Sequence, residues 1–94
     1  MLSEVREEMV AVIADVLSDG RARTLEQVLA ELRAEYPESV ETASCEYASA
    51  YGYSGCGQLM APVNAVADAL ACLEGRGEAV SFFRDGLKLW QNAS

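Results

Sequence analysis

The chain has 94 residues, a length that supports a single domain with one core. About half of the residues are hydrophobic (51%), which favours a folded globular chain over a disordered one. Fifteen acidic residues against seven basic ones give a net charge of −8, so a uniform surface of this composition would repel nucleic-acid phosphates and anionic lipids.

The first helix is expected over residues 4–18 and ends at Asp19-Gly20. Its buried stripe follows helical spacing and consists of Val5, Met9, Val12, Ile13, Val16 and Leu17. Val10 widens this stripe, which indicates either a deeper core or a contact between two copies of the helix. The second interpretation would make the chain a homodimer through this helix.

A short strand over residues 21–23 is expected to join the C-terminal sheet. Thr24-Leu25-Glu26-Gln27 then has the pattern of a capping box, in which Thr24 caps forward and Gln27 reaches back. The second helix buries Leu25, Val28, Leu29, Leu32 and Tyr36, and it ends before Pro37, because proline restricts the residue that precedes it.

Residues 37–57 form an insertion that is longer than an ordinary connection between helices. An interval of this length is typical of a functional loop, a disordered segment or an element that the pattern fails to reveal. Residues 38–48 are compatible with an extra short helix, which would leave 49–57 as a glycine-rich connection. The insertion also carries chemistry-bearing side chains, namely Tyr47, Tyr51, Tyr53, Cys45 and Cys56.

The last third of the chain predicts a helix followed by a β-hairpin. Apolar residues at helical spacing (Val63, Val66, Ala67, Leu70 and Leu73) lead to a stop at Gly75 and Gly77. Residues 79–83 and 87–91 read as strands around Asp85-Gly86, which favours a two-residue type I′ turn.

The two-residue turn pairs Arg84 with Leu87, Phe82 with Leu89 and Ser81 with Trp90. One face of the hairpin then holds Val80, Phe82, Leu87 and Leu89, and we expect it to pack on the helices. The other face holds Phe83, Lys88 and Trp90 and is expected to be exposed. A three-residue turn over 84–86 would shift the register and exchange part of these faces.

The third helix and the start of the hairpin (63–80), with the leucine, Arg-Gly and strand pattern Leu73-Glu74-Gly75-Arg76-Gly77, resemble the corresponding part of bacterial winged helix-turn-helix regulators. Residues 24–29 similarly resemble the start of the second helix in that superfamily. The resemblance covers most of the chain and implies an α+β, mostly α fold: one domain over 1–94, with three helices, a C-terminal hairpin wing and the insertion at 37–57.

The resemblance implies DNA binding through the third helix and the wing. Gln58 and Asn64 have amide side chains that can read an adenine edge. The cations available for phosphate contact are Arg21, Arg23, Arg76, Arg84 and Lys88. The expected outward face of the third helix (Ala61, Asn64, Ala65, Asp68 and Cys72) contains no Lys or Arg, which disfavours DNA binding.

Protein docking uses the same region differently. Phe83 and Trp90 on an exposed wing face would make a hot spot, with Tyr47, Tyr51 and Tyr53 of the insertion extending it. The competing interpretation is that both wing aromatics cover the edge of a small core. An acidic surface on the first two helices would suit a basic partner.

Catalysis and metal binding have little support. Histidine is absent, no phosphate-binding loop motif occurs, and the cysteines are too widely spaced for a structural zinc site. Cys45 and Cys56 remain candidates for a redox pair in the insertion, whereas Cys72 reads as a small helix residue. We therefore expect no enzymatic activity, no metal and no cofactor.

The acidic N-terminal segment lacks the pattern of a secretory signal, and no apolar run approaches the roughly 18 residues that cross a bilayer. We therefore expect a cytoplasmic protein without a membrane partner. Its expected function is regulation by protein docking through the wing and the insertion. The alternative is a dimeric transcriptional regulator that reads DNA with the third helix and the wing cations.

Overall fold

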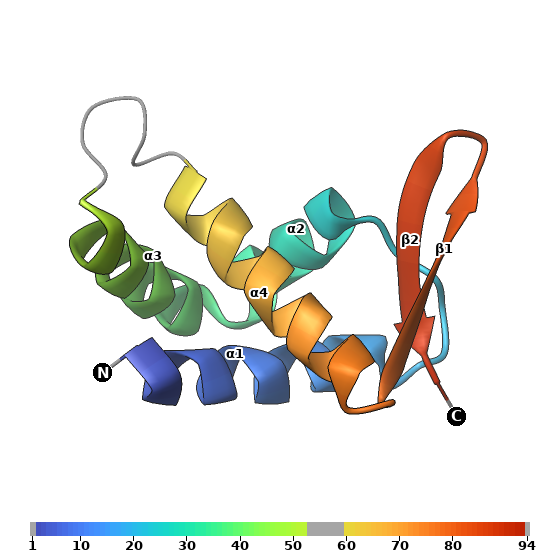
Figure 1. The fold of residues 1–94 in the computed structure, drawn as a ribbon, viewed down its shortest axis with the longest axis horizontal. Helices are drawn as coiled ribbons and strands as arrows, with labels where there is room; N and C mark the ends of the chain where they lie inside the picture. The colour runs from blue at the N-terminus through green and yellow to red at the C-terminus, as the bar shows by residue number, and fades with distance from the viewer. Residues whose placement is uncertain (1, 53–59, 94) are drawn as a thin grey trace.

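A computed structural model describes residues 2–52 and 60–93 of the chain. Figure 1 shows the helices packed together on one side and the hairpin standing at the other end. Within the described ranges the elements are α1 (Leu2–Leu17), α2 (Leu25–Glu35), α3 (Pro37–Tyr51), α4 (Ala61–Gly75), β1 (Ala79–Arg84) and β2 (Leu87–Asn92). The fold is α+β and mostly helical, with an antiparallel hairpin at the C-terminus.

The start of α2 has the capping box that the sequence predicts. The backbone N–H of Gln27 donates to Thr24 Oγ1 at 3.2 Å, and the N–H of Thr24 donates to Gln27 Oε1 at 2.9 Å. This exchange satisfies two donors that a helix N-terminus otherwise leaves unpaired. The helix therefore begins at a position fixed by its own first turn.

The insertion contains α3, which is longer than the extra helix that the sequence suggests. Pro37 stands in the first turn of α3, where its missing N–H costs nothing, so Tyr36 alone separates α2 from α3. Gly52, with a φ of 67°, closes the helix. The described chain thus has four helices where the winged-helix pattern predicts three.

The core is centred on α4, which packs against α1, α2 and α3. Its buried residues are Ala61, Pro62, Ala65, Val66, Ala69, Leu70 and Leu73. Val10 of α1 is buried within the same core. Of the two interpretations of Val10, the structure therefore supports the deeper core, and Val10 gives no support to a dimer through α1.

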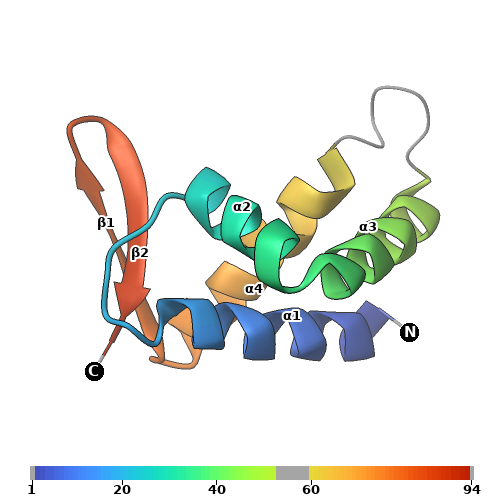
Figure 2. The ribbon, with the colours of Figure 1, turned by 180° about the vertical axis from the view of Figure 1, so that it is seen from behind.

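The hairpin has the predicted register, with Arg84 opposite Leu87, Phe82 opposite Leu89 and Ser81 opposite Trp90. Asp85 and Gly86 have φ values of 53° and 79°, as a type I′ turn requires. The expected strand at 21–23 is reduced to one bridge, between Arg23 and Trp90. β2 therefore lies between this bridge and β1. Toward the turn β1 is the outer strand, whereas its base follows directly from the end of α4 (Figures 1 and 2).

Candidate docking surface on the hairpin

The base of the hairpin is fixed to the end of α4 by one carboxylate. Glu74 Oε1 accepts from Trp90 Nε1–H at 2.8 Å, and its Oε2 accepts from the Ser81 hydroxyl at 2.9 Å. Trp90 is only 8% exposed and belongs to the core. The expectation that Trp90 stands on an exposed face is therefore wrong, because this carboxylate draws the indole inward.

A second anchor holds the segment that precedes α2 against β2. Arg23 exchanges backbone hydrogen bonds with Trp90, with N···O distances of 2.9 and 2.8 Å. Its buried guanidinium forms ion pairs with Asp19 and Glu31, each at 2.6 Å. The hydrogen bonds from Arg23 hold the pKa of Asp19 well below its usual range. Arg23 is thus a structural residue.

Beyond these anchors the hairpin exposes large apolar side chains. Phe83 is 73% exposed, Leu87 is 57% exposed and Val80 is 46% exposed. The prediction that the face with Val80 and Leu87 packs on the helices is wrong for these two residues, because the opposite face, with Trp90, turns toward α4. Leu89 on the predicted face is nevertheless buried.

Two cations lie among these apolar side chains. The Arg84 guanidinium lies 5.4 Å from the centre of the Phe82 ring, and Lys88 Nζ lies 5.2 Å from the centre of the Trp90 ring. Such cation–π contacts hold the charges close to the strands. We call Val80, Phe83, Arg84, Leu87 and Lys88 together the hairpin surface. It spans both faces of the hairpin, because Val80, Arg84 and Leu87 lie on one face and Phe83 and Lys88 on the other.

A shallow groove separates the hairpin from the start of α2. Its volume is about 270 Å³, and the residues that line it include Thr24, Leu25, Leu87, Lys88 and Trp90. Trp90 therefore contributes to the wall of the groove, while its indole is anchored to Glu74. The groove extends the hairpin surface toward the body of the molecule.

The tyrosines of the insertion do not join the hairpin surface. Tyr47 is fully buried, and its hydroxyl donates to Asp68 Oδ2 at 2.9 Å, so the prediction that it belongs to a docking patch is wrong. Burial raises the pKa of Tyr47. Tyr51 is exposed, but it ends α3 on the opposite side of the molecule from the hairpin (Figure 1). Tyr53 lies outside the described residues.

The face of α4 that was expected to read DNA is largely covered. Ala61 and Ala65 are each 1% exposed, and Asn64 and Asp68 are half-buried. The outward side of this helix instead carries Met60, just before its start, and Ala71. The prediction that this face of α4 points outward is therefore wrong, because α3 packs beside α4 and its Tyr47 hydroxyl donates a hydrogen bond to Asp68. Gln58 lies outside the described residues.

The predicted cations do not form one patch. Arg23 is buried, and Arg76 Nη2 pairs with Glu7 Oε2 at 2.5 Å, which raises the pKa of Arg76. Arg21 is exposed in the loop before α2, whereas Arg84 and Lys88 lie on the hairpin. The arrangement leaves two cations on the hairpin surface.

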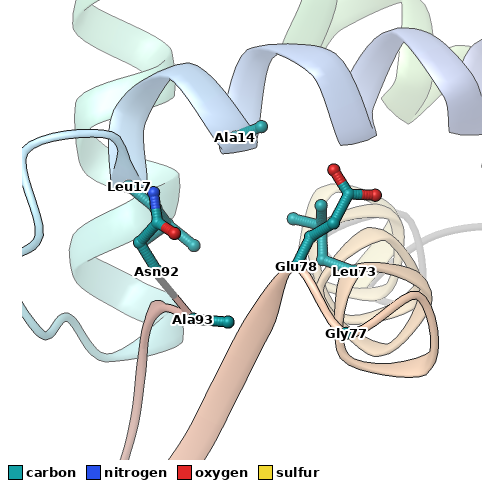
Figure 3. Close-up of a pocket in the computed structure, with 7 residues that line it drawn as sticks. All are labelled: Ala14, Leu17, Leu73, Gly77, Glu78, Asn92 and Ala93. Carbon is teal, nitrogen blue, oxygen red and sulfur yellow. The ribbon is translucent and has the colours of Figure 1, made fainter.

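A hollow of about 290 Å³ lies where the base of the hairpin meets α1 and α4 (Figure 3). Ala14, Leu17 and Leu73 give it an apolar wall, and the Glu78 carboxylate points across it toward Ala14. A carboxylate without a base or nucleophile beside it among the lining residues does not form a catalytic arrangement.

The cysteines give no metal centre in the described part of the chain. Cys45 is exposed and Cys72 is half-buried, and both are free thiols. Within 2–52 and 60–93 no three Cys, Asp or Glu side chains gather in a way that could hold a metal ion. Cys56 lies outside the described residues, and so does the expected redox pair with Cys45.

The sequence pattern does not reveal the roles of three residues of the site. Glu74 looks like an ordinary exposed helix residue, and only its distance to the Trp90 indole reveals its role. The pattern predicts that Val80 and Leu87 belong to the core, because their face of the hairpin has more apolar residues. The position of Leu87 beside the turn could have indicated its exposure, because the turn end of a hairpin lies farthest from the helices.

No protein-family model matches the chain, and comparisons with curated proteins and with solved structures give no match either. None of the helices in the described ranges has the length and apolar character that crossing a bilayer requires.

Proposed function

We propose that the chain is a small non-enzymatic regulatory protein of the winged helix-turn-helix type, with the C-terminal hairpin as its wing. It acts chiefly by docking another protein through the hairpin surface. Transcription regulation by contact with a protein partner is the process that this architecture and this surface suit best.

The observation that carries this proposal is the exposure of large apolar side chains on both faces of one hairpin, with Val80 and Leu87 on one face and Phe83 on the other. An exposed aromatic ring such as that of Phe83 is the kind of side chain that dominates interface energetics. Arg84 and Lys88 at its rim would orient a partner and speed its association, while most of the binding energy would come from the apolar side chains.

DNA binding is the second candidate, because Arg84, Lys88 and Arg21 are exposed cations near the hairpin. Two features oppose it. The net charge is −8, and the helix that would enter the major groove has its Ala61 and Ala65 face in the core. Several phosphate contacts normally precede base readout, and these cations supply few.

The test compares the wild-type protein with Phe83→Ser/Leu87→Ser in affinity capture from cells. Met60→Ser is the matched control, because Met60 is also an exposed apolar residue (49%) but lies at the start of α4. We expect the double variant to retain less than about a tenth of the captured partner and the control to retain nearly all of it.

A second arm measures retention of a random double-stranded DNA pool at about 50 mM and about 200 mM salt. Docking predicts no retention at either concentration. Salt-sensitive retention with an enriched motif, together with equal capture by the double variant and the control, would replace the docking proposal with DNA readout.

A further inference from the structure

The hollow at the base of the hairpin contains a carboxylate, that of Glu78, which takes no part in anchoring the hairpin. Ala14 and Leu17 of α1 and Leu73 of α4 form the apolar wall, and residues 92–93 lie across from Glu78 (Figure 3). The volume of about 290 Å³ is close to the lower end, about 300 Å³, of pockets that take small ligands. The hollow therefore has room for a ligand of a few heavy atoms.

The backbone of Glu78 is held on both sides. Gly77, with a φ of 75°, donates its N–H to Glu74 C=O at 3.0 Å, and the Glu78 N–H donates to Leu73 C=O at 2.9 Å. These two bonds form the Schellman motif that closes α4. The Glu78 C=O accepts from Ala93 N–H at 3.1 Å. The fold therefore fixes where the Glu78 side chain begins, whatever its charge.

Glutamate is an unexpected residue at this position. In a Schellman motif the residue after the left-handed glycine is frequently apolar and packs on the helix residue five positions earlier. That earlier residue is Leu73, which is buried, yet position 78 is charged and its carboxylate points toward Ala14 (Figure 3). A residue that breaks a local rule of stability without a structural gain is typical of a functional site.

The Glu78 carboxylate has no cation of its own. Within 2–52 and 60–93 it takes part in none of the ion pairs or side-chain hydrogen bonds. Arg76, two residues earlier, pairs with Glu7 at 2.5 Å. That hydrogen bond is the main cause of the raised pKa of Arg76, and attraction to Glu78 is a lesser one. The net charge of −8 also draws cations toward the chain.

We propose that this hollow binds an ammonium group carried on a short aliphatic chain. The ammonium pairs with the Glu78 carboxylate, and the methylene groups lie against Ala14 and Leu17. A free aliphatic amine and the side chain of a lysine share this chemistry. A neutral or anionic molecule of the same shape lacks the ion pair.

The test is a titration of the isotope-labelled protein with n-butylammonium chloride, followed by amide chemical shifts. We expect saturating shifts at Ala14, Leu17 and Glu78 with a dissociation constant of about 1–10 mM, because the ligand has few heavy atoms and the carboxylate is exposed. n-Butanol, which keeps the chain but lacks the charge, should bind at least about fivefold more weakly. n-Butanoate, with the opposite charge, should not bind.

Substitutions separate the carboxylate from the shape of the hollow. Glu78→Gln keeps the shape and should raise the dissociation constant by about fivefold or more. Glu8→Gln, at an exposed glutamate of α1 that does not line the hollow, is the matched control and should stay within about twofold. Glu78→Leu should abolish binding without lowering the thermal midpoint, because leucine supplies the apolar contact with Leu73.

A second probe distinguishes the two sources of the ammonium group. Nα-acetyl-lysine N-methylamide carries the same group on a chain that is attached to a peptide backbone. A dissociation constant within about fivefold of that of n-butylammonium would assign the hollow to lysine side chains, and a larger one would assign it to free amines.

Shifts that do not saturate below about 100 mM n-butylammonium would overturn the proposal. Equal affinities for n-butylammonium and n-butanol, or an affinity that Glu78→Gln leaves unchanged, would also contradict it. The proposal does not rest on the docking function, because Phe83→Ser/Leu87→Ser should bind n-butylammonium as the wild-type protein does. Loss of partner capture with retained amine binding, or the reverse, separates the two.

Discussion

The helix α4 and the C-terminal hairpin are neighbours in the chain but differ in how much of their surface they expose. Helices α1, α2 and α3 pack around α4, and most of its apolar side chains are buried. The hairpin is fixed at its base through Glu74 and Arg23 and carries Phe83 and Leu87 exposed toward its turn. Helix α4, which the winged-helix resemblance predicts to be the DNA-reading helix, is thus mainly a core helix.

One additional helix changes which surface of the molecule is available for recognition. α3 packs on α4 and donates the Tyr47 hydroxyl to Asp68, so a face that the sequence pattern leaves outward becomes covered. The hairpin gains no such cover. Stability and recognition are therefore expected to lie in different regions, and the following substitutions test this division.

The largest effect is expected in α4. Leu70→Ala should lower the free energy of unfolding by about 2–5 kcal/mol, because Leu70 is fully buried and its removal leaves a cavity. Leu87→Ala on the hairpin is the matched control and should cost less than about 0.5 kcal/mol. Urea unfolding of both variants measures the difference, and equal losses would contradict the division.

The next effect concerns the anchor of the hairpin. Glu74→Ala leaves Trp90 Nε1–H and the Ser81 hydroxyl without their acceptor and should cost about 1–3 kcal/mol. Trp90 is the single tryptophan, so its fluorescence reports on the anchor, and we expect emission at longer wavelength as water reaches the indole. Glu78→Ala, at an exposed glutamate, should leave the spectrum unchanged; a shift in that control would point to a different anchor.

A smaller effect is expected where α3 meets α4. Tyr47→Phe removes the hydroxyl that donates to Asp68 but keeps the buried ring, and should cost about 1 kcal/mol. Burial raises the pKa of Tyr47, so its absorbance should titrate at higher pH than that of an exposed tyrosine. Titration at the ordinary pH for tyrosine would show that α3 does not cover α4 as described.

The smallest effect at neutral pH is expected at Asp19, whose side chain is partly exposed. Because hydrogen bonds from Arg23 lower its pKa in the folded state, the pair contributes stability in full above the ordinary value of 3.8. This contribution is lost as the pH falls further toward the lowered pKa. Asp19→Asn should therefore be less stable than wild type at pH 7, and the gap should narrow below about pH 4 in urea unfolding. A stability difference between the two proteins that does not change with pH would contradict the lowered pKa of Asp19.

Much of the fold could be predicted from the sequence because its signals are local. The capping box at Thr24, the stop at Gly77 and the turn at Asp85-Gly86 each depend on residues within one short segment, and each is present. The site was harder to predict because it depends on distant contacts. Trp90 looks like an exposed aromatic until Glu74 is placed beside it, and alternation along a strand cannot say which face turns toward the helices.

Photo-crosslinking in cells tests most directly whether the hairpin surface is the docking site. A photoreactive phenylalanine analogue replaces Phe83 in one variant and Met60, at the start of α4, in another. We predict that position 83 forms adducts with a protein other than the chain itself, and that position 60 forms few adducts of any kind. Adducts with DNA at position 60, with none to another protein at position 83, would contradict the account.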